Sequence, residues 1–370
     1  MELLRLWSRT GDCQIDFLVT SGNAGIFDEE ARGLGAHVHY VRYGRTQVPR
    51  FAREFRRILR QGSYDAVHDH QDYASGWHFL IGAGLLPAVC VTHVHNPSYQ
   101  ILNNYGVTAG RRLTARAGKK LVAHYATQIT GTSRRVITEY GFDDAVFRNI
   151  SKRALHCGFD TARFLGDRAA AKAALCEEFG WPADAKIILC AGRIDESAEV
   201  GHPRNHKNSA FAVSVGIECC RRDRRVHMLL VGSPSQAVPI LEQRIAAAGL
   251  ASRIRFIGIR KDIERFMLGS DALLFPSRGE GLGMAAVEAQ AAGLPVLASD
   301  AVPRECVVVP DLVHFQRVEV GETIWATDLL QHLARRPNTA EANHKVAESP
   351  FSIGRSACAL LQLYSREMLT

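Results

Sequence analysis

The sequence predicts an α/β protein made of two domains, each built on a parallel sheet that helices cover. The chain has 370 residues, which is about the length of two ordinary domains. Short apolar runs alternate with helical patterns along its whole length, as they do in folds with parallel sheets. The alternation falls into two sets that meet around residues 158–183. Apolar residues make up 46% of the chain and charged residues 22%, which are ordinary proportions for a globular enzyme.

In the first set, each expected strand is a short apolar run that a turn or a helical pattern follows. A helix is expected over residues 50–60, because Phe51, Phe55, Ile58 and Leu59 recur there at helical spacing. The expected strands of this set are residues 16–20, 37–41, 65–68, 88–93 and 128–131.

The second set repeats the alternation after the junction. Helical patterns cover residues 236–248, 261–269 and 284–292, and residues 352–369 carry apolar side chains at the spacing of one more helix. The expected strands of this set are residues 186–191, 227–232, 254–258, 272–275 and 295–298.

Positive charge is concentrated in the first part of the chain. Residues 1–158 hold 20 Lys and Arg against 13 Asp and Glu, whereas residues 159–370 hold 25 of each kind. Five arginines surround the apolar stripe of residues 50–60, and residues 111–120 are also basic. Such a helix can lie on an anionic membrane surface, or it can be an ordinary solvated helix face. Nucleic acid is not an expected partner, because the basic stretches lack interleaved aromatic residues and any known binding module.

The cysteines and the apolar runs indicate the compartment. Nine cysteines are scattered without a C-x-x-C spacing, which indicates reduced thiols rather than a disulfide framework. No apolar run is long enough to span a bilayer, and the first residues are too polar for a secretory signal. We therefore expect a cytoplasmic protein, with the inner face of the plasma membrane as a surface on which it can lie.

The segment 277–300, SRGEGLGMAAVEAQAAGLPVLASD, carries the most specific chemistry of the chain. Its two carboxylates, Glu280 and Glu288, stand eight residues apart. Glu280 belongs to a glycine-rich loop after an apolar strand, and Glu288 belongs to the helix that follows. Backbone N–H groups at such a helix N-terminus suit an anionic ligand, and glutamates accept hydrogen bonds from hydroxyl groups. A sugar nucleotide carries both phosphate and hydroxyl groups, and it is therefore the ligand to test at this segment.

This segment resembles the E-x7-E signature of the retaining glycosyltransferases of family 4, which have the two-domain GT-B fold. Weaker matches to the exopolysaccharide and capsule-biosynthesis members extend the resemblance from residue 2 to about residue 365. The resemblance implies that Glu280 holds the donor sugar together with the backbone N–H groups of Gly281, Leu282 and Gly283. It implies that Glu288 holds the ribose hydroxyls.

Two cations resemble the family's Gly-Arg…Lys-Asn pair. Arg193 follows an apolar strand, and Lys207 follows after a loop of thirteen residues, 194–206, which is longer than is usual in the family. The resemblance implies that both clamp the donor diphosphate, where fixed positive charge stabilises a leaving group that becomes more negative. No Asp-x-Asp metal motif occurs in the chain, so we expect metal-independent transfer that needs no cofactor besides the nucleotide-sugar donor.

The segment Thr92-His93-Val94-His95-Asn96-Pro97 resembles the family's His-x-His-Asn segment. The resemblance implies that His95 lies beside the anomeric carbon, bonds a hydroxyl of the donor sugar and supports developing positive charge through its backbone carbonyl. His93 is expected to have a structural role.

The resemblance also implies a domain plan. Residues 1–158 form an acceptor-side Rossmann-like domain, residues 159–350 form a nucleotide-sugar-binding one, and residues 351–370 form a helix that crosses back to the first. The two parallel sheets face a cleft. The first strand of the N-terminal domain is apparently missing, because residues 1–7 look like the middle of the helix that follows that strand in the family.

We therefore expect a retaining glycosyltransferase that moves a sugar from a nucleotide-sugar donor to a hydroxyl of a glycan or lipid-linked acceptor, in cell-surface polysaccharide biosynthesis. Two alternatives stay open. One is a catalytically inactive subunit that binds a sugar nucleotide, and the other is an NDP-sugar epimerase, which shares the GT-B architecture.

Overall fold

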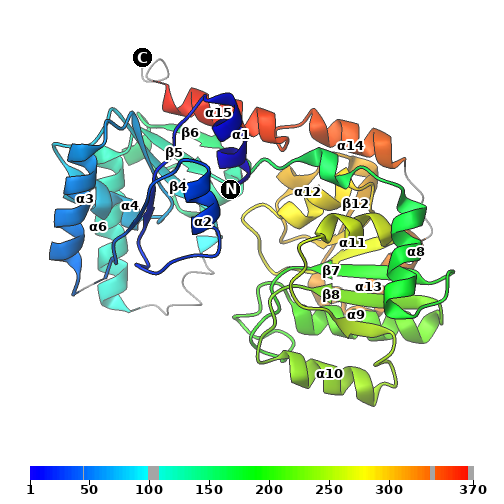
Figure 1. The fold of residues 1–370 in the computed structure, drawn as a ribbon. Helices are drawn as coiled ribbons and strands as arrows, with labels where there is room; N and C mark the ends of the chain where they lie inside the picture. Colours follow the sequence, from blue (N-terminus) through cyan, green and yellow to red (C-terminus); the bar gives the residue numbers. More distant parts are fainter. Residues whose placement is uncertain (45, 99–107, 334–337, 366–370) are drawn as a thin grey trace. The chain divides into compact units, whose positions relative to one another are not determined.

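The computed structural model describes residues 1–44, 46–98, 108–333 and 338–365, and its chain divides into two compact units (Figure 1). Among the described residues, the first unit holds residues 1–44, 46–96, 108–159 and 353–365, and the second holds residues 97–98, 160–333 and 338–352. Every strand pairing in both units is parallel. The predicted α/β class with parallel sheets is therefore confirmed.

The strands of the first unit form two separate sheets. Four of them pair in the order β3-β4-β5-β6, and the other two, β1 and β2, pair only with each other. No described strand joins β1 to β3. The strands are β1 (Phe17–Val19), β2 (Val38–Tyr40), β3 (Ala66–Asp69), β4 (Val89–Val94), β5 (Gln128–Gly131) and β6 (Ser151–Ala154).

Helices cover the sheets of the first unit through apolar faces and close glycine contacts. Helix α3 buries Phe51, Phe55, Ile58 and Leu59, and its exposed arginines, Arg50, Arg53, Arg57 and Arg60, lie outside this apolar face. Helices α4 and α6 approach so closely that a Cβ on Gly118 would lie 2.4 Å from the backbone oxygen of Tyr73. The helices are α1 (Glu2–Thr10), α2 (Asp28–Gly33), α3 (Val48–Gln61), α4 (Ala74–Gly82), α6 (Ala109–Tyr125), α7 (Arg134–Glu139) and α15 (Ile353–Tyr364).

Helix α15, the last described helix, belongs to the first unit and packs beside α1 (Figure 1). Leu360 and Leu363 of α15 join Trp7 of α1 in one apolar cluster with Val89 and Val91 of the sheet. The hydroxyl of Ser356 also donates a hydrogen bond to the backbone oxygen of His156, at 2.9 Å. Residues far apart in the sequence therefore cover one face of β4.

The second unit contains one six-stranded parallel sheet, in the order β12-β11-β10-β7-β8-β9. Its strands are β7 (Lys186–Ala191), β8 (Val226–Val231), β9 (Ile254–Phe256), β10 (Ala272–Phe275), β11 (Val296–Ser299) and β12 (Val313–Gln316). Its helices are α8 (Arg168–Phe179), α9 (Ser209–Arg222), α10 (Val238–Ala247), α11 (Ile263–Gly269), α12 (Met284–Ala291), α13 (Glu322–His332) and α14 (Thr339–Ala347).

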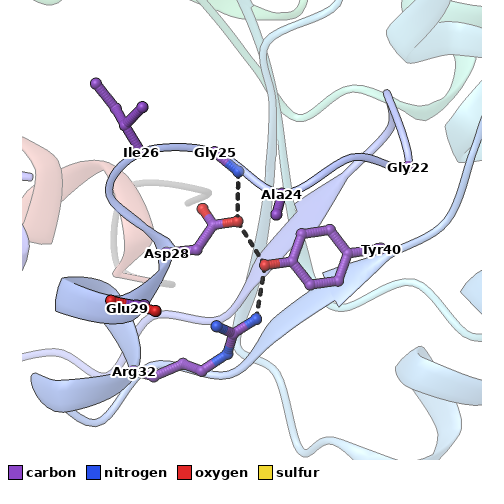
Figure 2. A pocket seen from close by; sticks show the side chains of 8 residues that line it. All are labelled: Gly22, Ala24, Gly25, Ile26, Asp28, Glu29, Arg32 and Tyr40. Atoms are coloured by element: carbon purple, nitrogen blue, oxygen red, sulfur yellow. Dashed lines mark hydrogen bonds between the residues drawn. The ribbon is translucent and has the colours of Figure 1, made fainter.

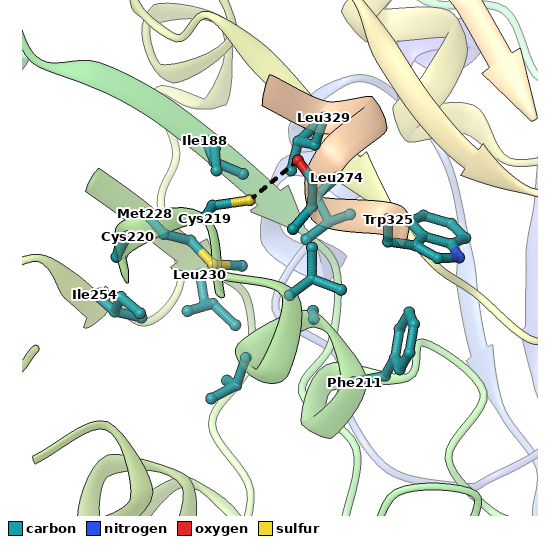
Figure 3. Close-up of a cluster of buried hydrophobic side chains, with 14 of the residues drawn as sticks. Ile188, Phe211, Cys219, Cys220, Met228, Leu230, Ile254, Leu274, Trp325 and Leu329 are labelled. Atoms are coloured by element: carbon teal, nitrogen blue, oxygen red, sulfur yellow. Dashed lines mark hydrogen bonds between the residues drawn. The ribbon is translucent and has the colours of Figure 1, made fainter. Parts of the chain in front are cut away.

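A large apolar core lies between this sheet and helices α9 and α13 (Figure 3). Ile188, Met228 and Leu274 project into it from three strands, and the rings of Phe211 and Trp325 meet edge to face at 5.6 Å. Such a core fixes the strand ends, because each central strand is buried on both faces.

Two further expectations concern cysteines and membrane crossing. All nine cysteines lie within the described residues, and all are free thiols, as the sequence analysis expects. Among the described helices, none combines the length and the apolar character that crossing a bilayer requires.

Candidate functional site

The predicted donor residues gather after the carboxyl ends of two neighbouring strands in the second unit. β7 and β10 pair directly, with Ile188 opposite Ala272 and Leu189 opposite Leu273. A loop that contains Lys207 leads from β7 to α9, and the loop with Glu280 leads from β10 to α12. Ligands of parallel sheets bind in this position, beyond the carboxyl ends of the strands.

Lys207 and Glu280 lie in direct contact. The Lys207 Nζ is 2.7 Å from Glu280 Oε1, and it lies 5.7 Å from the centre of the Phe275 ring. The side chain of Glu280 is 12% exposed and that of Lys207 is 32% exposed, so the carboxylate is the more buried partner. The pair offers an ammonium group for phosphate oxygens beside a carboxylate for hydroxyl groups.

The start of helix α12 presents unused backbone donors next to this pair. Gly283 precedes the helix with a positive φ of 99°, and a Cβ there would lie 2.9 Å from the side chain of Val302. Within the residues that the structure describes, no hydrogen bond is found for the N–H groups of Gly281, Leu282 and Gly283. Free N–H groups at a helix N-terminus attract negative charge, and they can donate hydrogen bonds to an anionic ligand.

Glu288 lies half-buried in the second turn of α12. Burial raises the pKa of its carboxyl to about 7, and nearby Arg163 offsets part of that rise. Arg163 itself donates a hydrogen bond to Glu264 at 3.1 Å. Glu288 therefore exchanges a proton near neutral pH, and it can donate or accept a hydrogen bond with a hydroxyl group.

Arg193 lies directly after β7 and is exposed to solvent. It is close enough to buried His206 to contribute to the lowering of that imidazole's pKa, although burial is the larger cause. The loop between Arg193 and Lys207 thus folds back, so that both cations lie near the same strand end.

A buried carboxylate that the sequence analysis did not select holds this loop in place. Asp195 is 3% exposed, and its oxygens accept hydrogen bonds from the N–H of Lys207 at 3.0 Å and the N–H of Ser209 at 2.9 Å. The Ser209 hydroxyl adds a third at 3.2 Å. Asp195 therefore fixes the backbone of Lys207 at the start of α9. Its position two residues after Arg193 was the only sequence signal for this role.

Gln290 is a second buried polar residue that the sequence analysis did not select. Its side-chain amide donates to the oxygens of Ala286 and Cys306, and its Oε1 accepts from the N–H groups of Val308 and Val309, both at 2.8 Å. It ties α12 to the segment after β11. An amide in a helix whose one other polar side chain is Glu288 is the signal that marks it.

His95 belongs to the first unit and follows β4. Its Nε2 lies 2.7 Å from Nδ1 of His70, and its backbone oxygen accepts a hydrogen bond from the Thr132 hydroxyl at 3.1 Å. Burial lowers the pKa of His95 to about 4, so the imidazole is neutral at pH 7.

A hollow of about 540 Å³ lies elsewhere in the first unit, between the loop after β1 and helix α2 (Figure 2). Its polar groups bind one another: Asp28 accepts from the N–H of Gly25 and from the Tyr40 hydroxyl, and Arg32 donates to that hydroxyl. Because these polar groups already bond one another, they are less available to bind a ligand than the backbone N–H groups at the start of α12.

Comparisons with known families match both units. The family model described as "Glycosyl transferase 4-like domain" matches residues 1–145, and the one described as "Glycosyl transferases group 1" matches residues 185–317. The D-inositol 3-phosphate glycosyltransferase of Mycolicibacterium smegmatis is 32% identical over 328 residues, which are 83% of this chain and 68% of that protein. The protein EpsF of Bacillus subtilis, a glycosyltransferase by name, is 27% identical over 95% of this chain and 88% of its own length.

Solved structures support the fold. The crystal structure of HepE from Anabaena in complex with UDP and glucose matches 99% of this chain and 95% of that one, with a TM-score of 0.71 and 16% identity. A glycosyltransferase from Rickettsia africae matches 100% of this chain with a TM-score of 0.75 and 17% identity.

Proposed function

The chain belongs to the family 4 glycosyltransferases with the GT-B fold, and we propose that it transfers a sugar from a nucleotide-sugar donor to a hydroxyl of a glycan or lipid-linked acceptor. We assign this reaction to the synthesis of a cell-surface polysaccharide. The name of the lipopolysaccharide core biosynthesis mannosyltransferase LpsB of Rhizobium meliloti, which is 27% identical over 60% of this chain, supports that assignment.

One observation carries the proposal: the contact of Lys207 with Glu280 beside the free N–H groups of Gly281, Leu282 and Gly283. Cation, carboxylate and anion-binding backbone lie together at the start of one helix, as a ligand with both phosphate and hydroxyl groups requires. Glu280 and the glycine loop hold the donor sugar, and Glu288 holds the ribose hydroxyls.

In the proposed reaction, the bond between the anomeric carbon and the diphosphate oxygen breaks while the acceptor oxygen attacks from the same face of the sugar. The acceptor proton passes to the departing phosphate oxygen, so the anomeric configuration is retained. Arg193 and Lys207 stabilise the charge that accumulates on the diphosphate, which makes a metal ion unnecessary for this step.

We assign His95 to a hydroxyl of the donor sugar, and its backbone carbonyl to the positive charge that develops at the anomeric carbon. The resemblance of the segment 92–97 supports this role. The neutral state of the imidazole at pH 7 is compatible with it, because an imidazolium would oppose that charge.

The test is turnover with UDP-, GDP-, TDP- and ADP-sugars by the wild type and by Lys207→Ala and Glu280→Ala. Loss of one charge-stabilising group typically lowers kcat by about 10²–10³-fold, and we expect each variant to fall in that range. Lys345→Ala is the matched control, because Lys345 forms an ion pair of the same 2.7 Å length with Glu341 at an exposed site of the same unit. Full activity of Lys207→Ala or Glu280→Ala would refute the site.

We further propose that the basic face of α3 contacts an anionic membrane on the cytoplasmic side. Arg53 and Arg60 are exposed, whereas Arg56 donates hydrogen bonds to the backbone oxygens of Ile81 and Ala83, both at 2.9 Å. Arg56 is thus a structural residue. Each surface arginine contributes about 1 kcal/mol to binding, so Arg53→Gln with Arg60→Gln should weaken binding to phosphatidylserine vesicles by about 30-fold. Unchanged sedimentation with vesicles would refute the proposal.

A further inference from the structure

Four histidines occupy one face of the first unit's sheet at the carboxyl ends of two neighbouring strands. In the parallel register of β3 and β4, His68 is opposite Val91 and Asp69 is opposite Thr92, so His70 comes level with His93. Side chains alternate between the two faces of a strand, and His68 and His70 therefore share a face with His93 and His95. Below them, Val89 and Val91 continue the same face into the apolar cluster that α1 and α15 cover.

The rings of these histidines are in contact. His68 Nε2 lies 3.0 Å from His93 Nδ1, and the His68 and His70 rings stack at 4.3 Å. One ring nitrogen from each of His68, His70 and His93 lies within 4.8 Å of the other two. The cluster runs from buried His93 through half-buried His68 to exposed His70, which leaves a path from solvent.

Neighbouring groups fix the orientation of two of the rings. The Nδ1 of His68 lies 2.7 Å from the Tyr364 hydroxyl of α15, and the Nδ1 of His70 lies 2.7 Å from His95 Nε2. When each Nδ1 bonds in this way, the Nε2 of the same ring remains for another partner. Metal-binding histidines have this arrangement, in which the second nitrogen is held by an outer partner.

Among the described residues, His93 turns its Nδ1 toward His68 Nε2 at 3.0 Å, whereas its buried Nε2 has no hydrogen-bond partner. The Nδ1 is therefore the nitrogen that His93 offers to an ion shared with His68. The nearest carboxylate is occupied, because Asp69 accepts from His78 Nδ1 at 2.6 Å and from the Ser75 hydroxyl at 2.7 Å.

We propose that His68, His70 and His93 bind one divalent transition-metal ion of the zinc class, with a coordination position left open. A donor set of imidazoles without a carboxylate suits Zn²⁺, Cu²⁺ or Ni²⁺ and does not suit Mg²⁺ or Ca²⁺. The site lies wholly within the first unit. It adjoins His95, which the proposed function assigns to the donor sugar, whereas Lys207, Glu280 and Glu288 belong to the second unit.

Zinc binding would require little movement of the rings of His68 and His93. Zinc binds imidazole nitrogen at about 2.0–2.1 Å, so two nitrogens on a tetrahedral ion lie about 3.3 Å apart. His68 Nε2 and His93 Nδ1 are already 3.0 Å apart. The side chain of His70, the most exposed of the three, is the one that must approach.

The experiment uses the full chain after treatment with a chelator and dialysis. Zn²⁺ binding is measured by competition with a chromophoric chelator, and Co²⁺ is added separately to record its visible absorption. We expect one equivalent of Zn²⁺ and the intense visible bands of tetrahedral Co²⁺. His70→Gln, at an exposed position, should weaken Zn²⁺ binding by more than about 100-fold, because loss of an outer partner alone costs about 10–100-fold.

Two further variants distinguish a specific metal site from nonspecific binding to surface histidines. Tyr364→Phe removes only the hydroxyl beside His68 and should weaken Zn²⁺ binding by about 10-fold. His124→Gln, at an exposed histidine of α6 in the same unit, should leave the affinity unchanged. Equal affinity of the wild type and His70→Gln, or the same loss in His70→Gln and His124→Gln, would overturn the proposal.

Discussion

Replacement of Glu288 by glutamine is expected to remove a pH dependence from the free energy of unfolding of the ligand-free protein. Burial raises the pKa of this carboxyl from the ordinary 4.5 to about 7. The folded protein therefore keeps a proton on Glu288 at pH values where the unfolded chain has lost it. Glutamine keeps the size and the polarity of the neutral acid but has no proton to release.

The direction of this pH dependence follows from the number of protons that the folded and the unfolded states bind. Below pH 4.5 both states carry the proton, so the neutral side chain costs the folded state nothing extra. As the pH rises from 4.5 towards 7, unfolding releases the proton and the stability falls; above 7 the loss is complete. Each pKa unit corresponds to about 1.4 kcal/mol, so the whole loss is about 3 kcal/mol.

The assay is urea denaturation of the wild type and Glu288→Gln at pH 5 and pH 8, followed by tryptophan fluorescence. From pH 5 to pH 8, the free energy of unfolding of the variant should rise relative to that of the wild type by most of these 3 kcal/mol. Glu196→Gln, at an exposed position of the same unit, controls for the loss of a negative charge. A stability difference between Glu288→Gln and the wild type that is the same at both pH values would refute the reasoning.

Two other predictions concern packing and the loop before α9. Gly118→Ala should destabilise the protein by about 1–3 kcal/mol, because its Cβ would lie 2.4 Å from the oxygen of Tyr73. Gly110→Ala in the same helix has open space and should be neutral or stabilising by up to about 1 kcal/mol; equal melting temperatures of the two variants would contradict the packing argument. Asp195→Ala removes the acceptor of three hydrogen bonds and should cost about 1–3 kcal/mol, with faster proteolysis of residues 194–206. A wild-type rate of proteolysis would show that other contacts hold the loop.

The central strands were predictable from the sequence because local and tertiary preferences agree there. The expected ranges 128–131, 186–191 and 272–275 coincide with β5, β7 and β10, whose side chains are largely buried. The strands β6 and β12 were not predicted. Both are edge strands with mainly half-exposed residues, and each is held by a single neighbour, so their pairing depends on the folded sheet and not on an apolar run.

The site was only partly predictable for a similar reason. Glu280 and Lys207 were selected by resemblance, but their contact joins residues 73 positions apart, which no local pattern encodes. Asp195 and Gln290 act on backbone groups of loops, and their partners come near only after folding. The histidines belong to two strands, and only the register of β3 and β4 brings them together.

The division of the first unit's sheet has a consequence for local opening. β4 has a hydrogen-bonded neighbour on each side, whereas β1 and β2 are held by one ladder of three residue pairs. The free energy that separates the closed from the open state of this two-stranded piece is therefore smaller than for the four-stranded sheet. Amide hydrogens of Phe17–Val19 and Val38–Tyr40 should exchange with deuterium well before those of Val89–Val94. An enzyme with this construction opens first at one corner of a domain while the rest of that domain stays folded.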